Sequence, residues 1–421
     1  MVGGAFHIIR TGTMKPLLRI ISFLLLFLSQ GQLLRAEEFR YGIDMIASGK
    51  GRCNCKIMKN KRVGLITNAA SLSREGEPSW QALVRRKIDL RFVMAPEHGF
   101  SLKGAAGVRV GETVIADSIR VYSLYGASKS PAPELMKQID VLAFDLQDVG
   151  TRCYTYISTM KLAMEACDKA GITFVVFDRP NPVAPLPAGG FMLEPAKASF
   201  VGAAELPFLH GMTVGEIALW LQKTRFPRLD LRVVRMRGYS HRKFADELDG
   251  FRFVAPSPNI RDLDTAILYP ATVMLEATDV SEGRGTVAPF ALFGAPFIDA
   301  AALKAELDRF ALTGVEIRTA EFTPSESKYA GQSCRGIRLR VIDRAAFDPF
   351  RTSTAILLSL QKLYPGKLGL SGNADFFDRL AGTSRYRVML QKHSPIKEIL
   401  EAARAPVQAF EEAWPDRFLY P

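Results

Sequence analysis

The sequence of 421 residues is poor in the side chains that usually hold transition metals, with only five cysteines and five histidines. It contains no Cys-x-x-Cys motif and no two histidines spaced four residues apart, so no zinc spacing is present. We therefore predict neither a bound metal nor a cofactor. Because five is an odd number, at least one cysteine is unpaired or bonded to another chain. Cys53 and Cys55 are too close for an unstrained bridge to each other.

The sequence signatures of nucleotide-binding and ester-cleaving enzymes are also missing. No Gly-x-Gly-x-x-Gly follows a predicted strand, and neither Gly-x-x-x-x-Gly-Lys nor Gly-x-Ser-x-Gly is present. A Rossmann-like sheet in this chain would therefore not imply a dinucleotide. Carboxylates, arginines and histidines remain as the candidates for chemistry. Cys153, which follows Arg152, is either a thiol with a lowered pKa or a small buried side chain.

The formal net charge of +12 invites a nucleic-acid interpretation, but the basic residues are dispersed and no recognition motif accompanies them. We therefore predict no nucleic-acid partner. A basic surface still favours approach to an anionic polymer or membrane.

The N-terminus resembles a targeting segment. Arg10, Lys15 and Arg19 precede an apolar core at residues 20–28, and Ala36 is a small residue at a possible cleavage point. We interpret residues 1–36 as a signal peptide or an uncleaved N-terminal anchor, and expect an exported protein, periplasmic or secreted. No other segment approaches the length of a membrane span.

Three apolar, β-prone runs each end in a polar, turn-rich segment. The runs at residues 90–93, 141–144 and 174–177 lead into segments 94–100, 145–152 and 178–182. Residues 156–170 have the apolar density of a helix and lie between the second and third runs, which predicts a βαβ unit in a parallel sheet. Packing alone explains the runs, but it does not explain why polar residues gather at their ends, where open α/β sheets bind ligands.

Two segments carry candidate chemistry. Glu97 and His98 lie just beyond a predicted strand, where they are either a proton-transfer pair or part of a solvated turn. Gly283 and Gly285 flank Arg284, which is either aimed at an anionic ligand or pinned in a structural turn by Glu276 or by Glu282.

Eight short motifs then occur in the order of one family. The motifs are Pro-Glu-His-Gly-Phe (96–100), Val-Tyr-Ser-Leu-Tyr-Gly (121–126), Asp-Leu-Gln-Asp-Val-Gly (145–150), Tyr-Thr-Tyr-Ile-Ser-Thr-Met (154–160), Asp-Arg-Pro-Asn-Pro (178–182), His-Gly-Met-Thr (210–213), Pro-Ser-Pro-Asn (256–259) and Gly-Arg-Gly-Thr (283–286) with Pro289 and Phe290. Together they resemble the NamZ-type exo-β-N-acetylmuramidases, a family long catalogued only as a domain of unknown function. The resemblance runs from about residue 64 to the C-terminus. The sequence departs from the family pattern at Ala277, Asp279, Cys153 and the link at residues 101–104.

The resemblance implies a glycosidase that releases N-acetylmuramic acid from the non-reducing ends of peptidoglycan fragments, with muropeptides or disaccharides as partners. It also implies a cleft between two domains, with Glu97 as the catalytic acid or base. Two alternatives are a hydrolase of another amino-sugar or phosphorylated substrate on the same scaffold, and a muropeptide-binding protein without turnover.

Glycoside hydrolysis needs an acid and a second group that attacks, stabilises or activates water. Asp145, Asp148, Asp178 or Glu276 are candidates for that second carboxylate, and the acetamido oxygen of the substrate is another nucleophile. We predict a catalytic set of Glu97, His98, Asp145 and Asp148. We predict a substrate-binding set of Arg152, Tyr154, Asp178, Arg179, Asn181, His210, Asn259, Glu276 and Arg284. Within this set, the lactyl carboxylate calls for Arg152, Arg179 or Arg284, and His98 or His210 orients Glu97 or binds a hydroxyl. Inversion, retention and substrate assistance all stay open.

For the architecture we predict an α/β protein. A Rossmann-like, mostly parallel sheet with helices on both faces spans residues 37–253, and a smaller mixed α/β domain at residues 254–421 closes the cleft. Further predicted helices are 213–224, 303–310, 352–363, 396–403 and 407–414, and further strands are 231–236 and 336–342.

Overall fold

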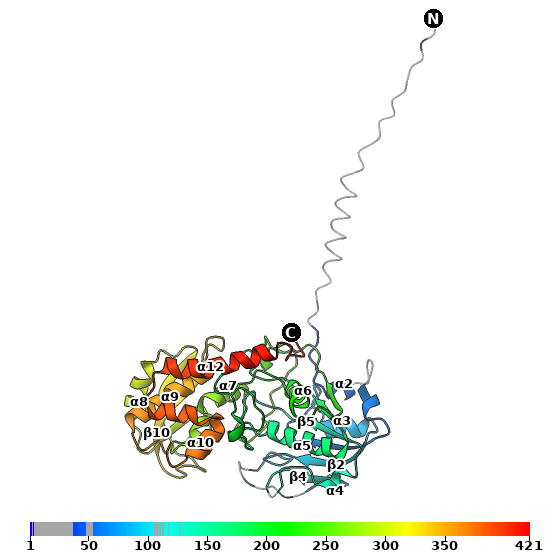
Figure 1. The fold of residues 1–421 in the computed structure, drawn as a ribbon, viewed down its shortest axis with the longest axis horizontal. Coiled ribbons are helices and arrows are strands. Elements are labelled where there is room, and N and C mark those ends of the chain that lie inside the picture. Colours follow the sequence, from blue (N-terminus) through cyan, green and yellow to red (C-terminus); the bar gives the residue numbers. More distant parts are fainter. Residues whose placement is uncertain are drawn as a thin grey trace. The chain divides into compact units, whose positions relative to one another are not determined.

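The computed structural model describes residues 37–47, 54–104, 108, 111, 113–116, 118–126 and 128–421, together with Met1 and Gly3. The rest of the predicted signal segment, Cys53 and the side chain of Cys55 lie outside this description. Residues 39–421 form one compact unit, which Figure 1 shows as a ribbon. Within the parts of the chain that the structure describes, no helix has both the length and the apolar character needed to cross a membrane.

A seven-stranded sheet forms the first part of this unit, in the order β3-β4-β2-β1-β5-β6-β7. The strands are β1 (Arg62–Thr67), β2 (Asp89–Ala95), β3 (Thr113–Ile115), β4 (Ile119–Ser123), β5 (Val141–Asp145), β6 (Thr173–Phe177) and β7 (Leu231–Val234). Only β3 is antiparallel to its neighbour. The predicted mostly parallel sheet is therefore confirmed.

The strands give their side chains alternately to two hydrophobic clusters, one on each face of the sheet. In β1, Leu65 belongs to one cluster and Ile66 to the other, and Ala143 and Phe144 of β5 divide in the same way. Successive strand residues point to opposite faces, so a strand buried on both faces needs apolar residues in succession. This is why the central strands appear in the sequence as continuous apolar runs.

Helices cover both faces, as predicted. The residues of α3 (Ser79–Arg85), with those of the short α2 (Asp44–Ala47), join the cluster that contains Leu65. The residues of α4 (Pro133–Met136), α5 (Tyr156–Ala170) and α6 (Val214–Arg225) join the cluster that contains Ile66 (Figure 1). The predicted helix 156–170 is confirmed as α5, which ends at Gly171 in the left-handed conformation.

The connections reverse direction between two central strands. From β1 the chain moves outward to β2 and β4, and then returns to the other side of β1 to begin β5. The crevice at the carboxyl ends of strands beside such a reversal is where open α/β sheets bind ligands. From the fold alone, a ligand is therefore expected to bind at the segments that follow β1, β2 and β5.

The second part has a three-stranded antiparallel sheet in the order β8-β10-β9. Its strands are β8 (Leu292–Ala295), β9 (Val315–Phe322) and β10 (Cys334–Val341). Its helices are α7 (Leu263–Thr272), the 3-10 turn η4 (Val273–Ala277), α8 (Ala300–Asp308), α9 (Pro349–Leu363), α10 (Ala374–Ala381), α11 (Ser384–Gln391) and α12 (Ile396–Ala413). The predicted domain boundary at residues 253 and 254 stays a prediction.

Most predicted elements of this part have counterparts, with one correction. Helices 303–310 and 352–363 correspond to α8 and α9, and strand 336–342 corresponds to β10. Helices 396–403 and 407–414 were predicted as two, but they form the single helix α12, which contains Pro406. Proline removes one helical hydrogen bond, but burial of Ala403 and Val407 on either side keeps the helix continuous.

Asp178, predicted to bind substrate, instead joins three segments of the chain. It follows β6 and is fully buried. One carboxylate oxygen accepts hydrogen bonds from the backbone N–H groups of Arg179 and Gly215, at 3.0 and 2.8 Å. The other accepts from the hydroxyls of Thr213 and Tyr420, at 2.8 and 2.6 Å. Asp178 thus fastens the start of α6 and the C-terminal segment to the end of β6.

We expect the stability of the protein to fall as pH rises from about 4 to about 7. Burial raises the pKa of Asp178 to about 7, and the nearby Glu216 carboxylate adds to the rise. In this window the folded protein holds a proton that the unfolded chain has released, so the Asp178 contribution to the free energy of unfolding decreases by up to about 1.4 kcal/mol per pH unit. Asp178→Asn should flatten that slope in urea unfolding between pH 4.5 and pH 7.5. The exposed Asp416→Asn is the control, and equal slopes for Asp178→Asn and wild type would refute the assignment.

Candidate active site

A cavity of about 270 Å³ lies between the carboxyl edge of the large sheet and the C-terminal part of the chain. Its walls come from the turn after β2, the segment after β4, the segment before α5, and residues on α7, η4 and α10. The lining residues are Glu97, His98, Tyr125, Lys129, Cys153, Tyr154, Thr155, Phe200, Val201, Ser257, Asn259, Ile260, Tyr269, Glu276, Arg284, Phe290, Phe376 and Leu380.

Glu97 and His98 enter the cavity from a tight turn after β2. The backbone of His98 is left-handed with φ at 72°, and the N–H of Gly99 donates to the carbonyl of Pro96 at 3.0 Å. This turn directs Glu97 toward the segment before α5, where the Thr155 hydroxyl donates to its Oε2 at 2.7 Å. Burial raises the pKa of Tyr125 to about 12, and the Glu97 carboxylate, which is hydrogen-bonded to the phenol, contributes to the rise. Glu97 is therefore a buried carboxylate held by two hydroxyl groups.

His98 is held beside Glu97 as a neutral imidazole. Its Nδ1 lies 2.9 Å from the carbonyl oxygen of Gly104. Because a carbonyl only accepts, Nδ1 carries the proton and the lone pair is on Nε2. Burial lowers the pKa of His98, and the neighbouring Glu97 carboxylate opposes that effect only in part. The imidazole can therefore accept a hydrogen bond at neutral pH.

The C-terminal part of the chain contributes a wall with four alternating charges. The Arg284 guanidinium binds Glu276 Oε1 at 2.5 Å and Glu282 Oε1 at 3.1 Å. Lys328 Nζ contacts the second oxygen of Glu282 at 3.1 Å and donates to the carbonyls of Leu275 and Val280. Arg284 therefore lines the cavity and is held by both Glu276 and Glu282, as in the pinned alternative that the sequence offered.

Burial and pairing act in opposite directions on these groups. Burial raises the pKa of Glu276, the Arg284 charge opposes this only in part, and the net shift is upward. Burial lowers the pKa of Arg284, but Glu276 and Glu282 outweigh it, and the net shift is upward. Arg284 is therefore a permanent cation whose charge is shared between two carboxylates.

Six of the predicted site residues meet in the cavity and seven do not. Those in the cavity are Glu97, His98, Tyr154, Asn259, Glu276 and Arg284. Those outside its lining are Asp145, Asp148, Arg152, Asp178, Arg179, Asn181 and His210. The seven lie at the expected edge of the sheet, but their polar groups are engaged mainly with other parts of the protein.

Asp145 and Arg179 form a buried ion pair. The guanidinium donates to both carboxylate oxygens, at 2.5 and 2.9 Å, and stacks over the Tyr41 ring. Arg179 lines a second, much smaller cavity of about 50 Å³ with Tyr41 and Gln147. This pair therefore joins β5 to the segment after β6 without reaching the large cavity.

Asp148, His210 and Asn181 fix the loops behind the site. Asp148 Oδ2 accepts the N–H of Gly150 at 2.7 Å and lies 3.3 Å from His210 Nε2. His210 Nδ1 accepts the N–H of Met212 at 3.1 Å, so Nε2 carries the proton of the neutral ring. Asn181 donates to the carbonyl of Met212 and accepts from the N–H of Val183. All three side chains therefore shape the backbone.

Arg152 is fully buried, and its terminal nitrogens donate to four backbone carbonyls. The acceptors, between 2.7 and 3.2 Å away, are the carbonyls of Phe191, Leu206, Leu380 and Ala381. Burial lowers the pKa of Arg152 to about 10, so it stays charged at neutral pH. It connects the first part of the chain to α10 and has no terminal nitrogen left for a substrate.

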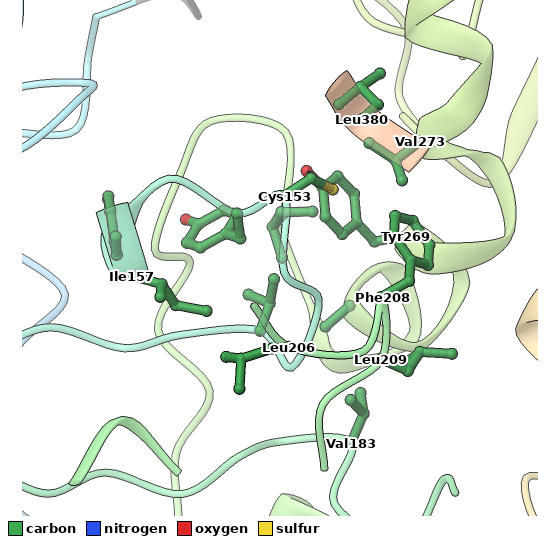
Figure 2. Packing of buried hydrophobic residues seen from close by; sticks show 14 of the residues in the cluster. Cys153, Ile157, Val183, Leu206, Phe208, Leu209, Tyr269, Val273 and Leu380 are labelled. Atoms are coloured by element: carbon green, nitrogen blue, oxygen red, sulfur yellow. The ribbon is translucent and has the colours of Figure 1, made fainter. Parts of the chain in front are cut away.

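Cys153 is a buried thiol, which is one of the two alternatives that the sequence offered. Burial raises its pKa to about 12, and its Sγ lies 3.7 Å from the Tyr269 hydroxyl. Figure 2 shows Cys153 beside Tyr269 of α7, among apolar side chains from both parts of the chain, including Phe208 and Leu380. These contacts form the floor of the cavity.

The sequence-based site set missed Tyr125, Lys129, Thr155, Ser257 and Tyr269, which all line the cavity. Tyr125, Thr155 and Ser257 lie inside motifs that carried the family resemblance, so that signal was available. Lys129 and Tyr269 lie outside every motif, and no feature of the sequence distinguishes them. Among the described residues, no group of three or more His, Cys, Asp or Glu side chains could hold a metal ion.

Comparison with known proteins agrees with this geometry over almost the whole chain. Residues 63–264 match the domain family described as exo-β-N-acetylmuramidase NamZ, N-terminal, and residues 267–420 match its C-terminal counterpart. The chain belongs to the NamZ exo-β-N-acetylmuramidase family. The peptidoglycan β-N-acetylmuramidase NamZ of Bacillus subtilis (strain 168) is 38% identical over 394 residues, which cover 93% of this chain and 94% of that protein.

Two solved structures have the same fold. A DUF1343 family protein from Bacteroides fragilis NCTC 9343 is 29% identical and superimposes with a TM-score of 0.83, covering 91% of this chain and 99% of that chain. A second DUF1343 family protein from the same organism is 24% identical, with a TM-score of 0.70 and the same coverage. The second likeness concerns the fold alone.

We expect Arg152→Met to lower the free energy of unfolding by about 3 kcal/mol, because it removes a charged donor from four buried carbonyls. Chemical denaturation at pH 7 measures the loss. Arg91→Met is the matched control, because Arg91 pairs with Asp89 on the surface at 3.3 Å and its loss should cost less than about 1 kcal/mol. An Arg152→Met variant as stable as Arg91→Met would contradict the structural role.

Proposed function

We propose that this chain is an exo-acting glycoside hydrolase that releases N-acetylmuramic acid from the non-reducing ends of peptidoglycan fragments. Membership of the NamZ family along nearly the whole chain supports the reaction class. The observation that carries the proposal is a cavity in which two carboxylates, Glu97 and Glu276, come from different parts of the fold. Its volume of about 270 Å³ is just below the roughly 300–1,000 Å³ of sites for drug-sized ligands, which suits one sugar residue.

In this proposal Glu97 is the general acid. It gives its proton to the glycosidic oxygen as the bond from that oxygen to the anomeric carbon breaks. His98, a neutral acceptor beside it, receives a sugar hydroxyl. Water finally adds to the anomeric carbon. Its proton returns to Glu97 if the acetamido oxygen attacked first, or passes to Glu276 and then to solvent, from which Glu97 is reprotonated, if Glu276 activates the water.

Glu276 takes the second role in this proposal. Of the four carboxylates considered for it, Asp145, Asp148 and Asp178 lie outside the cavity lining, and Glu276 lies within it. Arg284 holds one of its oxygens, which orients the carboxyl group and favours its ionised form against the effect of burial. An oriented carboxylate can accept the acetamido N–H while the acetamido oxygen attacks the anomeric carbon, or it can activate water directly. The configuration of the first-formed product distinguishes these two uses, because the first retains configuration and the second inverts it.

We also propose that the protein acts outside the cytoplasm. The basic residues, the apolar core at residues 20–28 and the small residue Ala36 support an export signal. Peptidoglycan, the substrate in this proposal, is also outside the cytoplasm, so the two proposals agree. Fractionation of cells that express the full chain would test this location.

The role of Glu97 predicts an effect that depends on the leaving group. We expect Glu97→Gln to lower kcat/KM for the disaccharide N-acetylmuramyl-N-acetylglucosamine by about 10²–10⁴-fold, because a sugar alkoxide needs a proton to leave. With 4-nitrophenyl N-acetylmuramide the loss should be much smaller, since nitrophenolate leaves without one. Release of the sugar and of 4-nitrophenol measures the two rates.

Equal losses on both substrates would instead assign Glu97 as nucleophile or base. A well-folded wild type that cleaves neither substrate would contradict the proposed function, and tight muropeptide binding by that protein would favour the binding-protein alternative. The matching 4-nitrophenyl N-acetylglucosaminide is the substrate control.

Lys328 should act as a positioning residue for the Glu276 and Arg284 wall. We expect Lys328→Met to lower kcat/KM about tenfold, because it removes the donor that holds Glu282 and two carbonyls of the same segment. Most of the loss should be in kcat, and Lys328→Arg should recover part of it. Lys392→Met, which removes an exposed lysine, is the control. Equal activity of Lys328→Met and Lys392→Met would show that Lys328 does not position the Glu276 and Arg284 wall.

A further inference from the structure

Lys129 is a cation of the active-site cavity that contacts aromatic rings. Its ammonium lies 4.1 Å from the centre of the Phe200 ring and 5.4 Å from the centre of the Tyr125 ring. The two rings lie 5.9 Å apart and are tilted by 51°. Cation–π contact holds an ammonium in place without neutralising its charge. Among the described residues, no carboxylate forms an ion pair with Lys129.

The arginines that the sequence offered for a substrate anion are committed elsewhere. Arg284 is shared between Glu276 and Glu282. Arg179 is paired with Asp145 outside the cavity lining, and the terminal nitrogens of Arg152 are occupied by backbone carbonyls. A ligand carboxylate would have to compete with these partners at each arginine. At Lys129 it would meet a lysine without a competing carboxylate.

Tyr125 contacts both Lys129 and Glu97, the proposed catalytic acid. Its hydroxyl is hydrogen-bonded to Glu97, and its ring lies beneath the Lys129 ammonium. A sugar that meets Glu97 with its glycosidic oxygen and lies along Tyr125 would bring its far side to Lys129. N-acetylmuramic acid differs from N-acetylglucosamine in the lactyl ether on C3, which ends in a carboxylate. A site that distinguishes a muramide from a glucosaminide by charge must therefore recognise that carboxylate.

We propose that Lys129 binds the lactyl carboxylate, and that this contact selects muramides over glucosaminides. The inference rests on the proposed muramidase function and names the specificity determinant of that site. Phe200 and Tyr125 hold the ammonium toward the sugar, and the carboxylate supplies a charge-assisted hydrogen bond that no described residue gives Lys129.

The experiment compares three substrates that differ at C3. They are 4-nitrophenyl N-acetylmuramide, its neutral lactyl methyl ester, and 4-nitrophenyl N-acetylglucosaminide. We expect the wild type to prefer the acid to the ester by about 10- to 100-fold in kcat/KM, the range of a charge-assisted contact. Lys129→Met should remove that preference by lowering only the rate on the acid, and Lys129→Arg should keep most of it.

Lys103→Met is the matched control. Lys103 is an exposed lysine in the loop that follows His98 and does not line the cavity, so its removal changes the net charge equally. It should leave the preference for the acid unchanged. Lys129→Gln, which is shorter and polar, should behave as Lys129→Met does and covers the case in which methionine impairs folding.

Two results would overturn the assignment while the muramidase function stands. The first is a wild type that cleaves the acid and the ester at equal rates. The second is a Lys129→Met variant that loses activity on the acid and the ester alike, which would mean that Lys129 only supports Tyr125 and Phe200. A wild type that cleaves none of the three substrates would instead overturn the proposed function, and the Lys129 assignment with it.

Discussion

The cavity depends on one buried charge, the guanidinium of Arg152. Its four carbonyl acceptors come from the loops at Phe191 and Leu206 and from Leu380 and Ala381 on α10. A buried guanidinium is costly unless its donors are satisfied, so these segments must meet whenever the protein is folded. Close packing enforces the same arrangement, because a Cβ at Gly382 would lie 2.5 Å from the guanidinium. Leu380 also lines the cavity, so the contact that joins the two parts of the fold sets one wall of the site.

A hydrophobic cluster shared by both parts of the fold supports the contact that Arg152 makes with α10. Apolar residues from α5, α7, α9 and α10 belong to one cluster that extends from a face of the large sheet into the C-terminal part. Figure 2 shows the part of this cluster around Cys153, Tyr269 and Leu380. Separation of the two parts would expose this surface as well as the Arg152 contacts, which opposes separation. The site is therefore built on a shared core, and Glu97 and Glu276 reach one cavity from different parts of the fold with little freedom to move apart.

The sequence predicted the part of the fold that local pattern controls. Central strands buried on both faces require continuous apolar runs, and a helix such as α5 needs a dense apolar face and a glycine stop. The short strands β3 and β4 have exposed residues at several positions, so they carry no comparable run. The strands β8 and β9 also were not predicted. Both pair antiparallel with β10, and this pairing joins segments that are not adjacent in the sequence.

The site was predictable only in part, for a related reason. Parallel strands place the residues that follow them at one edge of the sheet, so the sequence predicted Glu97, His98, Asp145 and Asp148 at the same edge, after β2 and β5. The sequence does not reveal which of these side chains turn toward the ligand and which pair internally. Asp145 and Arg179 satisfy each other, whereas Arg284 is shared by two carboxylates and still faces the cavity. Lys129 lies outside every motif. One of the rings that its ammonium contacts belongs to Phe200, 71 positions further along the chain, and a contact between residues so far apart leaves no local pattern in the sequence.

The pairing of Arg284 with two glutamates gives the proposed reaction a consistent electrostatic basis. The transition state of glycoside hydrolysis carries positive charge at the sugar ring, which nearby carboxylates stabilise. Two buried carboxylates without a counter-ion would shift upward in pKa and lose their charge. At Glu276 burial raises the pKa, and the Arg284 charge opposes that rise without cancelling it. Glu282, which is itself bound by Lys328, holds the Arg284 guanidinium as a second carboxylate partner. The wall therefore places an oriented carboxyl group beside a permanent cation in the cavity. Glu97, by contrast, is held by the hydroxyls of Thr155 and Tyr125, which fix the position of the group that the proposal assigns as the acid.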